Sequence, residues 1–226
     1  RGKGQKLNIG ASTGTNFSIY TTQEPSKYRS LNISFQDPMI NDSPYLVGAS
    51  IFYSFRGSST NYYFPLDFTV GGAVASFGRR LEWPDDFFRV MWSAKFMQKE
   101  YEGSQSDIDN YIGGLQKTRG ISLSQVLSRD SRNRAEFPTN GSTFILENTY
   151  SGGFLGGNEN FQKHMLTLDW FTPTFSKFIL YNSVKLGVIK TLDVGDDIQS
   201  FVPFDERFIM GGNGIPYGNA LRGYPD

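Results

Sequence analysis

The sequence predicts an all-β protein whose strands form part of a transmembrane, antiparallel, up-and-down β-barrel. Apolar and polar residues alternate in several runs, as in Leu31-Asn32-Ile33-Ser34-Phe35, and this is the period of a strand. These runs are roughly 9 to 15 residues long, whereas strands of globular proteins average about 5 to 6. No window of about 18 apolar residues could form a membrane-spanning helix. The mean hydropathy of −0.38 suits strands that face lipid on one side only.

Alternation places nine strands in order along the chain. The expected ranges are 5–17, 29–37, 45–56, 68–82, 87–101, 111–129, 142–152, 160–172 and 177–191. Turn-forming clusters such as Asn41-Asp42-Ser43-Pro44 separate them, so consecutive strands are expected to pair as hairpins. No stretch shows a sustained helical stripe, and no helix is predicted.

The fifth run indicates which face meets lipid. Arg89, Ser93 and Lys95 alternate there with Phe88, Trp92 and Phe96. A cation at the bilayer midplane costs roughly 2 to 4 kcal/mol. We therefore expect Arg89, Ser93 and Lys95 to face the lumen and the three aromatic residues to face lipid.

Aromatic residues near the run ends are expected to form the girdles that barrels carry at both membrane interfaces. These residues are Tyr45, Tyr53, Tyr62, Tyr63, Phe87, Tyr101, Tyr150, Phe171 and Tyr181. A general preference of aromatic side chains for strands accounts for the same positions, so both interpretations stay open.

Charge and residue counts exclude several classes of function. The 22 Lys and Arg balance 22 Asp and Glu, which argues against a nucleic-acid partner. Cys is absent, so no disulfide or zinc-cysteine site is expected. The single histidine, His164, lies in a strand without the Ser and Asp pattern of a nucleophile and its base, and we expect it at the rim or in the lumen without a catalytic role.

Carboxylate pairs do not form a ligand set. Asp85-Asp86 and Asp196-Asp197 are adjacent residues in expected turns, where they serve as solvated turn formers rather than as metal ligands. The sequence therefore predicts no catalytic site, no metal and no cofactor, and a protein that is not an enzyme.

Two segments carry a family resemblance. The first, residues 128–142, contains Asp130, Arg132 and Asn133, followed by Phe137-Pro138-Thr139-Asn140-Gly141. It resembles a strand end and turn of Omp85-superfamily barrels. Asp130 and Arg132 are two residues apart on an extended chain, so they share a face and are expected to form an ion pair of structural value. Pro138 and Gly141 are expected to shape the turn, because proline presets φ and glycine permits a positive φ.

The second segment resembles the long sixth extracellular loop of the same superfamily. Phe208-Ile209-Met210 leads into the Gly211-Gly212 step, and Leu221 precedes the motif Arg222-Gly223-Tyr224. The resemblance implies that Arg222 points back into the barrel and makes bidentate, charge-assisted hydrogen bonds there. Gly223 would allow close approach to the wall, and Tyr224 would offer a flat contact beside it.

The resemblance covers the whole chain. It implies an incomplete barrel domain over residues 1–226, with the third to the eleventh of sixteen barrel strands and the sixth loop over residues 192–226. The other strands and the periplasmic POTRA domains would lie outside this sequence. The implied location is the outer membrane of a Gram-negative bacterium.

The implied function is that of the superfamily's central assembly factors, which fold and insert client β-barrels into the outer membrane without covalent chemistry. The implied partners are nascent outer-membrane proteins, accessory lipoproteins, the POTRA domains of the same chain and outer-membrane lipid. A TamA-type assembly factor, a two-partner secretion transporter and a passive porin remain as alternatives, and the porin is the one that would not need Arg222-Gly223-Tyr224 beyond its last strand.

Overall fold

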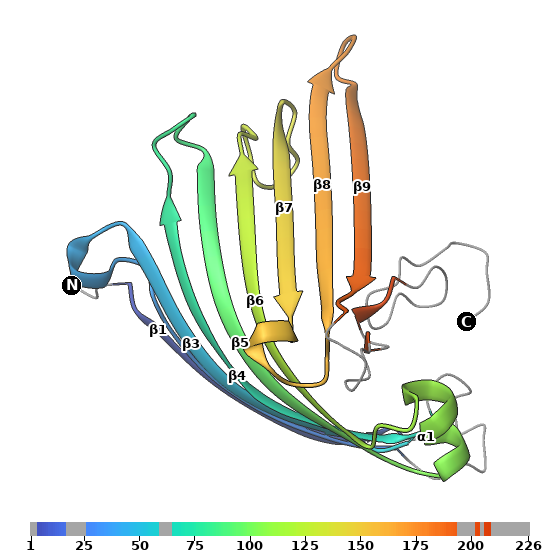
Figure 1. The fold of residues 1–226 in the computed structure, drawn as a ribbon. Helices are drawn as coiled ribbons and strands as arrows, with labels where there is room; N and C mark the ends of the chain where they lie inside the picture. The colour runs from blue at the N-terminus through green and yellow to red at the C-terminus, as the bar shows by residue number, and fades with distance from the viewer. Residues whose placement is uncertain (1–3, 17–25, 59–64, 194–201, 204–205, 209–226) are drawn as a thin grey trace.

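A computed structural model of the chain describes residues 4–16, 26–58, 65–193, 202–203 and 206–208. Within these residues, nine strands form one antiparallel sheet in chain order from β1 to β9 (Figure 1). The strands are β1 (Lys6–Asn16), β2 (Ser26–Asp37), β3 (Tyr45–Arg56), β4 (Asp67–Arg80), β5 (Phe88–Glu102), β6 (Lys117–Asp130), β7 (Gly141–Ser151), β8 (Phe161–Pro173) and β9 (Ile179–Thr191). The predicted all-β, up-and-down architecture is confirmed.

The main departure from the prediction is a short helix, α1 (Gln105–Ile112), where the sixth strand was expected to begin at residue 111. Ser104 caps it by accepting a hydrogen bond from the Asp107 backbone N–H at 3.3 Å, and Gly113 ends it with φ of +65°. Eight residues are too few to produce a clear helical period. None of the described helices has the length and apolar character needed to cross a membrane.

Helix α1 covers the principal apolar cluster among the described residues. Ile108 and Ile112, one turn apart, are buried against Leu66 and Tyr101. The Tyr101 ring lies 5.2 Å from the ring of Phe68, measured between centroids. This cluster closes the end of the sheet that we name the loop end, where α1 and the segment after β9 lie. The opposite end, with turns 81–87, 131–140 and 174–178, is named the turn end.

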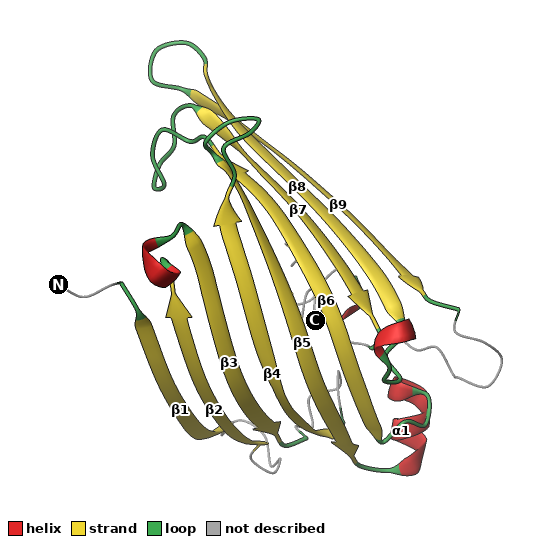
Figure 2. Ribbon diagram, turned by 60° about the vertical axis from the view of Figure 1, so that its left-hand side comes forward, coloured by secondary structure: helices red, strands yellow, loops and turns green. Residues whose placement is uncertain are grey.

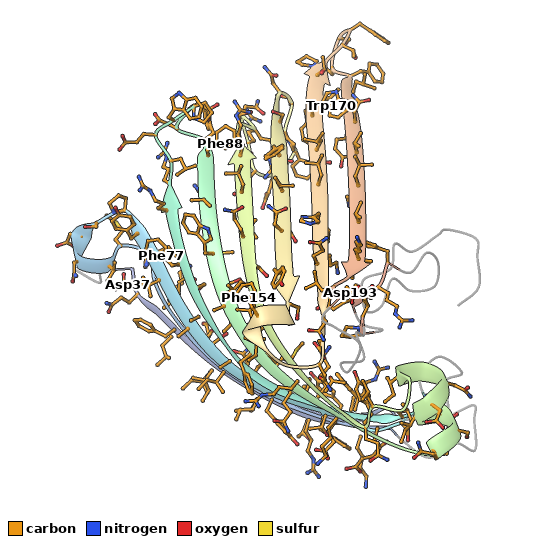
Figure 3. All side chains as sticks on the ribbon, viewed as in Figure 1. Asp37, Phe77, Phe88, Phe154, Trp170 and Asp193 are labelled. Carbon is orange, nitrogen blue, oxygen red and sulfur yellow. The ribbon has the colours of Figure 1, made fainter. Side chains whose placement is uncertain are left out.

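The two faces of the sheet differ as the alternation predicts. Register pairs Trp92 with Gln125, and Ala94 with Leu123, on one face. That face carries much of the exposed apolar surface, including Leu7, Ile9, Leu31, Ile33, Phe35, Ile51, Phe77, Leu180, Val184, Leu186 and Val188. Figure 3 shows the side chains along both faces of the strands, with Phe77 and Trp170 labelled. So much exposed aliphatic surface suits a face that meets acyl chains.

The sheet curls into a trough (Figures 1 and 2). The described pieces of the segment after β9 lie inside its curve, coloured red in Figure 1 and seen behind β6 in Figure 2. The face that bears Lys95 contacts this segment, so it is the lumen face, and the Trp92 face points outward. Arg89 and Lys95 therefore lie on the lumen side, as expected.

Some of the predicted interface aromatics lie elsewhere. Tyr101 belongs to the buried cluster under α1, so its assignment to a girdle is wrong. Phe171 and Tyr181 stack at 4.9 Å between centroids on the lumen-facing side of β8 and β9, where the Tyr181 hydroxyl donates to Asp169 at 2.9 Å. Their position near strand ends predicts a girdle, but the alternation of side chains along each strand points these two residues to the lumen. Tyr62 and Tyr63 lie outside the described residues.

Candidate functional site: the lumen face and the segment after β9

Lysines from two strands project onto the lumen face near the loop end. Lys95 and Lys99 lie on β5, four residues apart and on the same face, and Lys163 lies on β8. Each alternates with outward-facing residues, so the same period that predicted Lys95 to face the lumen places the other two there. The carboxylates that pair with these lysines come from connecting segments rather than from strands.

Glu159, in the connection between β7 and β8, pairs with Lys99. The Lys99 Nζ lies 3.2 Å from Glu159 Oε1, and the two side chains are only 0% and 2% exposed. The Thr118 hydroxyl donates a hydrogen bond to the same oxygen, Glu159 Oε1, at 2.7 Å. Gly120 leaves room for this carboxylate, because a Cβ there would lie 2.5 Å from Glu159 Oε2. The connection is therefore fixed onto the lumen wall by a buried, hydrogen-bonded ion pair.

Glu206, in the segment after β9, lies between the other two lysines. The Lys163 Nζ donates to Glu206 Oε2 at 3.1 Å and to the Glu206 backbone carbonyl at 3.0 Å. The Lys95 Nζ lies 3.8 Å from the other carboxylate oxygen, Oε1. The Lys163 and Glu206 side chains are 9% and 13% exposed, so solvent screens this contact only in part.

Small residues on the intervening strands make space for the Glu206 side chain. β6 and β7 lie between β5 and β8, and they present Ser122, Thr149 and Ser151 to the lumen. These three residues line a small cavity together with Lys95 and Glu206. A bulky residue at any of the three positions would occupy the space through which Glu206 reaches both strands.

Phe208 adds an apolar contact two residues further on. A Cβ on Gly187 of β9 would lie 2.5 Å from Phe208 Cζ, so the ring sits directly over this glycine. The Lys163 Nζ also lies 5.2 Å from the centre of the same ring, within the range of a cation–π interaction. Charge and shape thus hold the segment at two adjacent points.

The residues of the first motif lie at the turn end, far along the strands from this cluster. Arg132 Nε and Nη2 donate to the two carboxylate oxygens of Asp130 at 2.9 and 2.8 Å, which is a bidentate ion pair. The side chains are 27% and 53% exposed. Pro138 lies in the same connection, directly after Phe137, which adopts a positive φ of +52°.

Gly141 begins β7 with a φ of +104°, and a Cβ there would lie 2.3 Å from the Ser131 carbonyl oxygen. Both observations require glycine at this position. The close approach of the chain at Ser131 and Gly141 is what brings the ends of β6 and β7 together.

Arg129 organises the neighbouring turn. Its Nε donates to Asp85 Oδ2 at 2.8 Å, and its guanidinium lies over the rings of Phe87 and Phe88 at 5.6 and 5.9 Å. Burial works to raise the pKa of Asp85, but the hydrogen bonds from Arg129 and from the Phe87 backbone N–H outweigh it and leave the pKa lowered. Asp85 therefore holds its charge, and the turn between β4 and β5 is tied to the end of β6.

The residues of the second motif, Gly211, Gly212, Arg222, Gly223 and Tyr224, lie outside the described residues. Their predicted roles remain predictions.

His164 lies on the outward face, where its Nδ1 is 2.8 Å from Asn148 Oδ1, and not on the lumen side, one of the two places expected for it. His164 directly follows Lys163 on β8, so the two side chains point to opposite faces of the sheet. Within the part of the chain that the structure describes, no group of three or more His, Cys, Asp or Glu residues could hold a metal ion.

Sequence reasoning missed Glu206, Lys163 and Gly187. The alternation of β8 and β9 assigns Lys163 and Gly187 to the lumen face, so that part of the signal was available. Glu206 lies 43 residues from Lys163 in a segment without strand period, and no local pattern links the two.

These features define a class of protein: a transmembrane β-barrel domain with a loop segment held against its lumen wall. The chain belongs to the Omp85 superfamily, whose domain matches residues 1–226. Its place is accordingly the outer membrane of a Gram-negative bacterium.

Known proteins similar to this chain include assembly factors. The chain is 27% identical over 207 residues to "Outer membrane protein assembly factor BamA" of Nitratidesulfovibrio vulgaris, a match that covers 88% of the chain and 23% of that protein. It superimposes with a TM-score of 0.71 and 16% identity on the crystal structure of BamA from Haemophilus ducreyi lacking POTRA domains 1-3, covering 94% of the chain and 39% of that structure. The chain thus spans well under half the length of these proteins.

Proposed function

We propose that this protein is the core component of a machinery that folds and inserts client β-barrel proteins into the outer membrane. Membership of the Omp85 superfamily supports the general role, and the BamA relative supports the specific one. The proposed chemistry is non-covalent. Client strands would pair with an exposed strand edge by β-augmentation, in which main-chain hydrogen bonds provide the affinity.

The observation that carries the proposal is the docking of the segment after β9 inside the trough. The start of this loop is ion-paired to the lumen wall through Glu206, which suits a loop that re-enters the barrel. Thirteen residues lie between Phe208 and Arg222, so a fully extended segment could span up to about 50 Å from a point already within the lumen. This supports a role for Arg222 as an inward-pointing anchor, with Gly223 and Tyr224 beside it.

In this proposal β1 to β9 are the third to eleventh strands of a sixteen-stranded barrel, and residues 192–226 are its sixth extracellular loop. The described wall would be the stable part of the barrel, because its strands satisfy each other's hydrogen bonds over 9 to 14 paired residues. The opening seam would lie elsewhere. The proposed partners are nascent outer-membrane proteins, accessory lipoproteins, POTRA domains and outer-membrane lipid.

The test is reconstitution of the full-length protein, with its accessory subunits, into lipid vesicles. An unfolded outer-membrane protein is added, and its folding is followed by the change in gel mobility between heated and unheated samples. We expect faster folding than in empty vesicles, and slower folding with Arg222→Ala.

Vesicles that contain a plain porin provide the control for a non-specific effect of any barrel on the bilayer. The proposal fails if the wild-type protein accelerates client folding no more than the porin does. Export of a secreted client without any effect on barrel folding would instead identify a secretion transporter.

A further inference from the structure

We propose that Glu206 is a second lumen anchor of the loop after β9, separate from the arginine motif, and that it fixes where the loop enters the barrel. Lys163, Lys95 and Gly187 would be its receiving site on the wall. This inference deepens the proposed function, because it concerns the positioning of the same loop.

The charge pattern supports an anchor rather than an incidental surface contact. One carboxylate meets two ammonium groups from strands that are not neighbours, at 3.1 and 3.8 Å. Lys163 also binds the backbone carbonyl of Glu206 at 3.0 Å, so it holds the main chain as well as the side chain. Charge-assisted hydrogen bonds of this kind are about twice as strong as neutral ones.

The local backbone presents Glu206 in a fixed orientation. The Glu206 backbone N–H donates to the Pro203 carbonyl at 3.0 Å, and Arg207 Nε donates to the Val202 carbonyl at 3.1 Å. Pro203 is itself buried. These contacts hold Glu206 and Arg207 against Val202 and Pro203, so less conformational freedom is lost when the carboxylate binds its lysines.

The absence of a side chain at Gly187 of β9 leaves room on the lumen wall for the ring of Phe208. A Cβ added at this glycine would lie 2.5 Å from Phe208 Cζ. Gly187 pairs with Met165, the next lumen-facing residue after Lys163 on β8. The ion pair of Glu206 with Lys163 and the contact of Phe208 with Gly187 are therefore adjacent. Each of them restricts the movement of the segment that would break the other.

The experiment uses the purified full-length protein in detergent micelles and measures trypsin cleavage after Arg207, the residue between the two contacts. Cleavage of a docked segment follows the fraction of molecules in which it is open. We expect Glu206→Gln and Lys163→Met each to raise the initial cleavage rate, relative to that of the same variant when unfolded, roughly tenfold, which corresponds to about 1.4 kcal/mol. Gly187→Ala should raise it as well, without any change of charge.

The matched control is Glu100→Gln. Glu100 pairs with Lys117 at 2.7 Å, but on the outward face, with 35% and 66% of the side chains exposed. The Glu100→Gln variant should be cleaved after Arg207 at the same rate as the wild type. Heat-modifiable gel mobility reports whether each variant is folded.

Unchanged cleavage in folded Glu206→Gln and folded Gly187→Ala variants would overturn the anchor. The client-folding assay separates this outcome from failure of the proposed function. If the wild type does not accelerate client folding while the variants open the loop, the anchor stands and the assembly function falls. If client folding is accelerated and cleavage does not respond, the anchor alone is rejected.

Discussion

The two ends of the sheet use ion pairs under opposite conditions. Near the loop end, Lys99 and Glu159 are almost fully buried, and each partner comes from a distant part of the chain. At the turn end, Asp130 and Arg132 are two residues apart and are partly exposed to water, at 53% and 27% of their side chains. Removing one partner should therefore cost much stability at the loop end and little at the turn end. The reason is that a buried ion left without its partner has also lost its hydration.

Replacement of Lys99 by Met should have the largest effect on stability. It leaves the Glu159 carboxylate buried with the Thr118 hydroxyl but without its cation, which typically costs about 3 to 5 kcal/mol. The measurement is the urea midpoint of unfolding of the full-length protein in detergent micelles. Lys117→Met, which removes the exposed partner of Glu100, is the matched control and should move the midpoint little.

A midpoint for Lys99→Met equal to that of Lys117→Met would remove the distinction between the two ends. Replacing both members, with Lys99→Met and Glu159→Gln together, should recover part of the loss, since no charge is then left buried alone.

At the turn end the backbone should matter more than the charges. Gly141→Ala must accommodate a φ of +104° and a Cβ 2.3 Å from the Ser131 carbonyl, and we expect a loss of about 1 to 3 kcal/mol. Gly10→Ala is the control, because a Cβ at Gly10 meets nothing within 4 Å. The same urea titration compares them, and equal midpoints would show that the turn relaxes without cost.

Arg132→Ala should lower the stability by about 1 kcal/mol or less, because its pair with Asp130 is partly exposed and screened by solvent. The comparison with Lys99→Met is the direct measure of what burial adds. A loss as large as that of Lys99→Met would mean that the turn pair is shielded from water in the folded protein.

The smallest predicted effect is that of acid, which should destabilise the turn between β4 and β5. The pKa of Asp85 lies below its ordinary value of 3.8, so its contact with Arg129 stabilises the folded turn above that pH and is lost as the pH falls through the lowered pKa. Hydrogen exchange of residues 81–87 should therefore rise, relative to the intrinsic rate, below about pH 4. In Asp85→Asn this pH dependence should disappear, and its persistence would assign the change to another group.

The sequence predicted what depends on local period and missed what depends on connections. Strand alternation gave nine strands with ends close to those observed, and the spacing of Asp130 and Arg132 predicted that they share a face. Helix α1 was missed because eight residues between two strands carry no sustained period. The pairing of Thr118 with Glu159 across 41 residues depends on how the β7–β8 connection folds back over the wall, which no local pattern encodes.

Zero-length carbodiimide cross-linking of the full-length protein in outer-membrane vesicles tests the central claim most directly. The reagent joins an amine and a carboxylate that are already in contact, and peptide mass spectrometry identifies the pair. We predict links from Glu206 to Lys163 and to Lys95, with the exposed Lys117–Glu100 link as the internal standard for reactivity. Recovery of the standard link without any link from Glu206 to the wall would contradict a loop root docked in the lumen.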